Sequence, residues 1–224
     1  MQFNSIHFLF FFIVIIFFYF AINYRYRWVF LLLASYYFYM CWKPEYVLLI
    51  IFSTLIDYYA GIKMGQYQNK LDKAPYLILS LITNLGILFF FKYFNFFNES
   101  IKTTLNFLNI SYNLPYLEMV LPVGISFYTF QTLSYSIDVF RGDKKPENHL
   151  GVFALYVAFF PQLVAGPIER STRLLPQLKK KLNFDLLRVK KGLLLMLWGF
   201  FKKIVIADRL AVLVNTVYND PTNY

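Results

Sequence analysis

Polar side chains recur along one side of the apolar segment LPVGISFYTFQTLSYSIDVF, residues 121–140. At about 100° per residue of helix, its large polar groups fall within about 80° of one another. The stripe consists of Gly124, Tyr128, Gln131, Tyr135 and Asp138. Hydrocarbon cannot satisfy such groups, so the stripe must face protein or water. The spacing predicts a helix that lines a cavity or forms a polar seam. Asp138 is a functional candidate, unless it simply pairs with Arg141.

A second set of polar residues lies in FFPQLVAGPIERSTRLLPQL, residues 159–178. Three prolines and a Gly-Pro pair exclude one continuous helix there. Gln162, Glu169 and Arg170 stand beside this irregular backbone, which needs buried hydrogen-bond partners. We expect a structured loop that enters a membrane protein from the cytoplasmic face, and the alternative is a plain surface loop.

The composition indicates which kind of protein these residues belong to. The 224 residues are 58% hydrophobic, 22% aromatic and 15% charged, with a mean hydropathy of +0.49. Such a composition predicts an integral membrane protein. Cys41 is the only cysteine, which excludes an intrachain disulfide and a cysteine-based metal site. The net charge of +10 comes from basic residues that flank apolar runs, which favours cytoplasmic loops over nucleic-acid binding.

The apolar runs predict an all-α, polytopic membrane protein with several tilted, short or re-entrant helices. We expect residues 1–224 to be one portion of a single membrane-embedded domain, with no soluble domain. The lipid bilayer is then the first partner. The runs lie at residues 6–22, 28–42, 45–61, 76–94, 120–140, 151–164 and 193–217.

The distribution of basic residues shows that one of these runs does not cross the membrane. If all seven crossed, the most basic loop, residues 165–192, would lie on the outer side, against the positive-inside rule. Residues 151–164 would reach only about 21 Å as a helix, against a hydrocarbon core of about 30 Å, and Pro161 breaks their end. We therefore predict a re-entrant or steeply angled segment there. GLLLMLWGFF, residues 192–201, suits an interfacial helix, and the alternative is a span over 193–217.

These stretches resemble a known family. LPVGISFYTFQTLSYSIDVFRG, FFPQLVAGPIER and WGFFKKIVIADRL are similar to the membrane-bound O-acyltransferases, within their bacterial alginate O-acetyltransferase branch. ASYYFYMCW and FSTLIDYYAG extend the resemblance through the N-terminal part of the chain. The resemblance implies a ring of tilted helices around a funnel in the cytoplasmic (inner) membrane, crossed several times. It also implies an acyl thioester donor, acetyl-CoA or an acyl carrier protein, and an extracytoplasmic polysaccharide with a possible acetyl-acceptor protein.

The family's catalytic histidine follows a tryptophan, and no histidine of this chain does. The only two histidines are His7 and His149. We therefore assign no catalytic residue, and expect a chain that matches only the N-terminal half of the family and is inactive without its continuation. The alternatives are a membrane transporter or channel component and an envelope scaffold.

Residues in the two polar stretches match parts of the family near its funnel. The resemblance implies that they shape the cavity and do not perform the chemistry. These candidates are Gln131, Ser134, Tyr135, Asp138, Gln162, Gly166, Pro167, Glu169 and Arg170.

Overall fold

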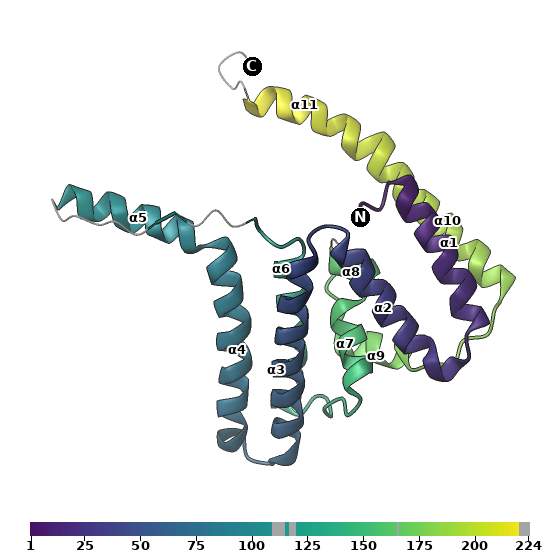
Figure 1. The fold of residues 1–224 in the computed structure, drawn as a ribbon, viewed down its shortest axis with the longest axis horizontal. Coiled ribbons are helices and arrows are strands. Elements are labelled where there is room, and N and C mark those ends of the chain that lie inside the picture. Colours follow the sequence, from purple (N-terminus) through teal and green to yellow (C-terminus); the bar gives the residue numbers. More distant parts are fainter. Residues whose placement is uncertain (109–114, 117–119, 165, 220–224) are drawn as a thin grey trace. The chain divides into compact units, whose positions relative to one another are not determined.

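The computed structural model describes residues 1–108, 115–116, 120–164 and 166–219, and every regular element in them is helical (Figure 1). This confirms the predicted all-α class. The α-helices are α1 (Ile6–Ala21), α2 (Arg27–Met40), α3 (Val47–Gln66), α4 (Lys70–Lys92), α5 (Phe94–Phe107), α6 (Ile125–Arg141), α7 (Leu150–Ala158), α8 (Phe160–Leu163), α9 (Ser171–Leu178), α10 (Leu186–Phe200) and α11 (Asp208–Asn219). The shorter elements are the 3-10 helices η1 (Tyr24–Tyr26) and η2 (Pro44–Tyr46) and the π-helix η3 (Phe201–Ala207).

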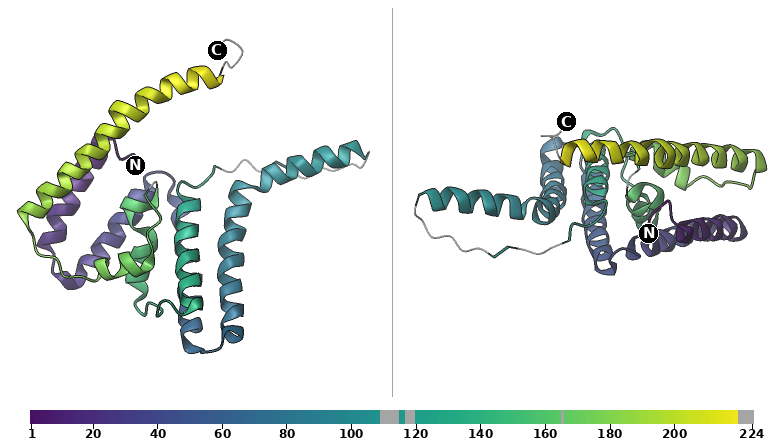
Figure 2. Two further views of the ribbon diagram at one scale, coloured as in Figure 1. Left: turned by 180° about the vertical axis from the view of Figure 1, so that it is seen from behind. Right: turned by 90° about the horizontal axis from the view of Figure 1, so that it is seen from above.

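The chain divides into two compact units. The first comprises Met1 and residues 14–181, and the second comprises residues 2–13 and 182–224. In the first unit α3 and α4 lie side by side, and α6 packs against both (Figures 1 and 2). α7 packs against α2, α3 and α9. The buried core of this unit therefore lies where α6 and α7 meet α2, α3 and α4.

Among the described residues, two helical segments are long and apolar enough to cross a bilayer. They are Pro44–Gln66, which joins η2 to α3, and α4. Asn69 begins α4 by accepting a hydrogen bond from the Leu71 backbone N–H, 3.2 Å away. The helix thus begins six residues before the apolar run predicted at 76–94. The apolar run does not include its first turns because they are polar. Ile6–Ala21 and Leu150–Leu163 are shorter apolar segments. Length and composition are those of an all-α membrane protein.

α6 is bounded by two glycines in the left-handed backbone conformation. Gly124 has φ 77° and Gly142 has φ 86°. A Cβ at Gly124 would lie 2.0 Å from the Leu163 carbonyl oxygen, whereas one at Gly142 would meet nothing within 4 Å. Glycine is therefore favoured at both positions by the positive φ, and at Gly124 it is also required by the close packing against Leu163. The helix begins at Ile125 and not at residue 120, because Pro122 and Gly124 precede its first regular turn.

Residues 150–164 do not form one helix of span length, as predicted. α7 has nine residues, α8 has four, and the backbone turns between them at Phe159, with ψ 110°. Pro161 lies in the first turn of α8, where its missing N–H is tolerated. Seven consecutive residues of α7, Val152 to Ala158, are buried. The backbone is therefore enclosed by protein up to the break, where Phe159 is half-buried and Pro161 is exposed.

In the second unit α10, η3 and α11 follow one another without a break over residues 186–219. The Asp185 carboxylate begins α10 by accepting hydrogen bonds from the Leu187 and Arg188 N–H groups. The stretch predicted as an interfacial helix, residues 192–201, is helical, and the helical backbone continues through Lys202 and Lys203 as η3. Lys203 pairs with Asp208 at 2.8 Å, which compensates one of these charges. That this stretch lies in the membrane interface stays a prediction.

The connection after α4 begins with α5, which carries polar side chains in its second half. The hydroxyls of Ser100, Thr103 and Thr104 each donate to the backbone carbonyl four residues earlier, so they are satisfied within the helix. Residues 109–114 and 117–119 of the connection lie outside the described part of the chain.

Candidate functional site

The break between α7 and α8 separates a backbone donor and acceptor that a continuous helix would join. In an α-helix the Phe160 N–H would bond the Tyr156 carbonyl. Instead, the Gln131 side-chain amide donates to Tyr156 O at 2.7 Å, and Phe160 N donates to the Ser35 hydroxyl at 3.2 Å. Gln131 is 3% exposed and Ser35 is fully buried. Two side chains from other helices thus replace the hydrogen bond that the break removes.

Tyr156 extends this connection across the interface of α6 and α7. Its hydroxyl lies 3.2 Å from Gln131 O and 3.3 Å from Glu169 O, and can donate to either. The Ser134 hydroxyl also donates to Gln131 O, at 2.8 Å. Gln131, Ser134 and Tyr156 therefore form a polar seam between α6 and α7. Of the two interpretations left open by the sequence, the seam is the one that these contacts support for Gln131.

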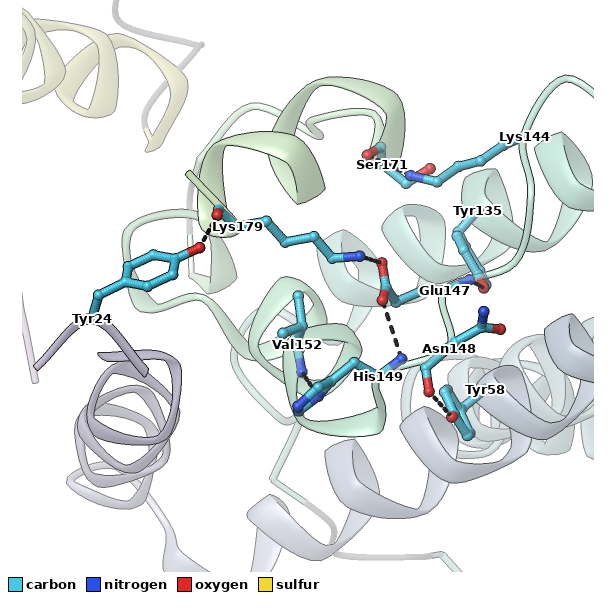
Figure 3. Close-up of polar contacts among 10 residues, drawn as sticks. All are labelled: Tyr24, Tyr58, Tyr135, Lys144, Glu147, Asn148, His149, Val152, Ser171 and Lys179. Atoms are coloured by element: carbon cyan, nitrogen blue, oxygen red, sulfur yellow. Dashed lines mark hydrogen bonds and ion pairs between the residues drawn. The ribbon is translucent and has the colours of Figure 1, made fainter. Parts of the chain in front are cut away.

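The loop after α6 is held by charged residues, as Figure 3 shows. Glu147 is 6% exposed, forms an ion pair with Lys179 at 2.6 Å, and accepts a hydrogen bond from His149 N. The backbone N–H of Glu147 donates to the Tyr135 hydroxyl at 2.9 Å. Lys144 donates to the Ser171 carbonyl at 2.6 Å. These contacts join α6, the loop and α9 into one cluster.

Lys144 is only half-exposed, which affects its protonation. Burial lowers the pKa of Lys144 from 10.5 to about 8, although the nearby Glu147 carboxylate acts in the opposite direction. The positive charge of Lys179 lowers this pKa further, and Asp138 raises it. Lys144 is therefore partly neutral in mildly alkaline solution.

His149 has a structural role in this structure. It begins α7, and its ring Nδ1 accepts a hydrogen bond from the Val152 N–H at 3.2 Å. Its ring also stands edge-on to that of Trp28, with centroids 4.7 Å apart. Because Nδ1 caps the helix, no general-base role is assigned to His149.

Asp138 lies near the end of α6, where its backbone carbonyl accepts hydrogen bonds from Asp143 N and Lys144 N. Its side-chain Oδ2 is buried and has no hydrogen-bond partner among the described residues. No ion pair joins Asp138 to Arg141 in that part of the chain, so the alternative of simple pairing was wrong. Asp138 thus keeps an acceptor that a partner or substrate could engage.

The second predicted stretch places its residues differently. Gln162 also has a buried acceptor, Oε1, without a partner among the described residues, and its backbone carbonyl accepts from Gly166 N at 3.1 Å. A Cβ at Gly166 would approach Gln162 Cα to 2.5 Å, so the loop folds tightly at this point. Glu169 reaches Arg173 at 3.9 Å. Pro167 and Arg170 are exposed. The cavity-shaping role of these residues stays a prediction.

A third polar set, which the sequence did not predict, lies beside the stripe of α6. Thr132 and Ser136 are buried there together with Asp57 of α3 and with Ser80 and Asn84 of α4. An ionisable residue inside an apolar run is a signal that could have identified Asp57. A helical wheel of residues 121–140 alone cannot show this set, because Asp57, Ser80 and Asn84 lie on other helices.

Comparison with known proteins shows relatives along almost the entire chain. The chain is 38% identical to the probable alginate O-acetylase AlgI of Pseudomonas syringae over 219 residues, which is 96% of the chain and 42% of the relative. It is 37% identical to that of Pseudomonas aeruginosa, again over 96% of the chain and 41% of the relative. The peptidoglycan O-acetyltransferase of Helicobacter pylori is 35% identical over 81% of the chain and 38% of the relative.

No protein-family model and no solved structure matches the chain. The chain spans about 40% of the length of these curated relatives. Their identity of 35–38% nevertheless extends over most of the chain's helices, including the seam and the broken helix. The comparison therefore confirms the resemblance predicted from the sequence: over most of its length the chain is similar to a part of proteins named alginate O-acetylase and peptidoglycan O-acetyltransferase.

Proposed function

We propose that the chain is the N-terminal portion of a membrane O-acetyltransferase, which passes an acetyl group from a cytoplasmic thioester donor to an exported polysaccharide. The observation that carries this proposal is its similarity to proteins named alginate O-acetylase and peptidoglycan O-acetyltransferase. Both names describe the acetylation of a carbohydrate polymer, so an envelope polysaccharide is the proposed class of acceptor. We place the protein in the cytoplasmic membrane, crossed several times, with residues 165–192 on the cytoplasmic side.

Acyl transfer to a hydroxyl needs a base that activates the hydroxyl and donors that stabilise the oxyanion. Neither histidine of this chain is assigned as that base. His149 caps α7, and His7 lies at the start of the first apolar run. We propose that the catalytic histidine belongs to a continuation beyond residue 224, and that the chain alone does not transfer acetyl groups.

In this proposal the described helices have a supporting role. The seam of Gln131, Ser134 and Tyr156 holds the broken helix α7–α8 inside the protein. Asp138 and Gln162 keep buried acceptors without partners among the described residues. A substrate hydroxyl or an N–H group of the continuation would satisfy these acceptors, because unpaired buried acceptors are unfavourable.

A labelled acetyl thioester tests the proposal in two arms. Membranes from cells that encode the protein are expected to transfer label to polysaccharide hydroxyls, and membranes from cells that lack it are not. The purified 224-residue chain is expected to transfer none. Equal transfer by the two membranes would refute the enzyme proposal, and transfer by the purified chain would refute the need for a continuation.

A further inference from the structure

A carboxyl group is fully buried between three helices, away from the seam. Asp57 of α3 is 0% exposed, and it meets Ser80 and Asn84 of α4 and Thr132 and Ser136 of α6. None of these five side chains is more than 1% exposed. We call this set the Asp57 node. It lies at the contact of the three helices that pack side by side in the first unit (Figure 1).

The contacts of the node are of hydrogen-bond length. Asp57 Oδ1 lies 2.5 Å from Ser80 Oγ, and Asn84 Nδ2 lies 2.9 Å from each Asp57 carboxyl oxygen. Asn84 Nδ2 also donates to the Ser80 carbonyl at 2.9 Å. The Thr132 hydroxyl, 3.1 Å from Asn84 Oδ1, can donate to that oxygen. This arrangement directs the amide nitrogen of Asn84, and not its oxygen, toward the carboxyl group.

Counting hydrogens limits how the chain of contacts can be satisfied. Ser80 Oγ is within bonding distance of both Asp57 Oδ1 and Ser136 Oγ, the latter at 2.9 Å, but a hydroxyl carries a single hydrogen. If Asp57 is protonated, it donates to Ser80, and Ser80 donates to Ser136. If Asp57 is ionised, every donor reverses, with Ser136 donating to Ser80 and Ser80 to Asp57. The same geometry thus accommodates a bound or an absent proton.

The surroundings of the node decide between these two states. The side chains of the node around Asp57 are neutral: Ser80 and Asn84 contact its carboxyl group, and Ser136 and Thr132 contact those two in turn. No ion pair of the described residues includes Asp57. α4 contributes only Ser80 and Asn84 to the node. From α6, the Tyr135 hydroxyl would lie 2.9 Å from a Cβ at Gly61, one turn after Asp57. An unpaired carboxylate in a membrane-spanning segment is unfavourable without a compensating charge.

We propose that the Asp57 node is a proton-binding site, in which Asp57 is a neutral carboxylic acid that donates to Ser80. The bound proton removes the charge from the interface of α3, α4 and α6, so that the three helices can pack together in hydrocarbon. A bound cation would be the other way to compensate the negative charge of an ionised Asp57. It is disfavoured because Asn84 presents nitrogen to the carboxyl group, and nitrogen that carries hydrogens is not a ligand.

Infrared spectroscopy of the chain in lipid nanodiscs tests the protonation state directly. The difference spectrum between wild type and Asp57→Asn at neutral pH is expected to show the loss of one carbonyl band of a protonated carboxylic acid. Asp72→Asn, which alters an exposed carboxylate of α4, is the matched control and is expected to remove only carboxylate absorption. Loss of a carboxylate band in Asp57→Asn would overturn the proposal.

Thermal unfolding gives an independent measurement. An asparagine at position 57 can donate to Ser80 and accept from Asn84, as the neutral acid does, so Asp57→Asn is expected to unfold close to wild type. Asp57→Ala is expected to unfold at a clearly lower temperature. Equal losses in the two variants would overturn the proposal. A higher unfolding temperature of wild type in sodium than in choline, absent in Asp57→Asn, would also overturn the proposal. It would show a bound cation in place of the proton.

Discussion

At the scale of single residues, one side chain of α6 and one of α2 replace a backbone hydrogen bond. Gln131 bonds the Tyr156 carbonyl that the break before α8 leaves open, and Ser35 accepts the matching Phe160 N–H. Backbone groups inside a membrane must be satisfied within the protein. This explains why an otherwise apolar segment carries a glutamine into the protein interior.

Gln131→Leu tests this role. The substitution keeps the volume but removes the donor, so Tyr156 O is left unpaired. We expect the free energy of unfolding to fall by about 1–3 kcal/mol, measured by thermal or denaturant unfolding in detergent. Ser100→Ala, which removes only an exposed hydroxyl that bonds within α5, is the control and is expected to change it little. Equal stability of Gln131→Leu and wild type would contradict the role.

Lys144 gives a prediction about pH. Its pKa is lowered from 10.5 to about 8, so between these values the unfolded chain binds more protons at this residue than the folded chain does. The folded state therefore gains stability from this residue as the pH rises through that window. Lys144→Met is expected to remove this gain, measured as the slope of the melting temperature against pH. Lys145→Met, at an exposed position, is the control. An unchanged slope in Lys144→Met would contradict the lowered pKa of Lys144.

At the scale of elements, the contact of α6 with α8 depends on a glycine. Gly124 combines φ 77° with a Leu163 carbonyl 2.0 Å from the position of a Cβ. We expect Gly124→Ala to destabilise the fold by about 3 kcal/mol or more, through backbone strain and a clash with backbone atoms. Gly142→Ala has the same sign of φ but open space, and is expected to lose only about 1–2 kcal/mol. Unfolding of the two variants compares them, and similar losses would contradict close packing at Gly124.

The sequence predicted some elements for physical reasons that the structure confirms. The short length of residues 151–164 and Pro161 indicated a broken helix, and the prolines of 159–178 excluded a continuous one. A helix through Lys202 and Lys203 was only the alternative prediction, because the pairing of Lys203 with Asp208 is not visible in hydropathy. The partners of Gln131 and Asp57 come from other helices, and a single helical wheel cannot identify them.

At the scale of the whole molecule, orientation in the membrane follows from the basic loops. We expect residues 165–192 on the cytoplasmic side and Cys41, between the second and third apolar runs, on the outer side. A membrane-impermeant maleimide should label Cys41 in intact cells. It should label Lys180→Cys, in a Cys41→Ser background, only after permeabilisation. Labelling of Lys180→Cys in intact cells would contradict the re-entrant topology.

The central claim is that this chain is part of an enzyme that acetylates an envelope polysaccharide. The most direct test is the amount of ester-linked acetate on exported polysaccharide and on peptidoglycan in cells whose reading frame is interrupted before Gly124. We expect that acetate is lost from one of these polymers and returns when the intact gene is restored. Unchanged acetate on both polymers would contradict it.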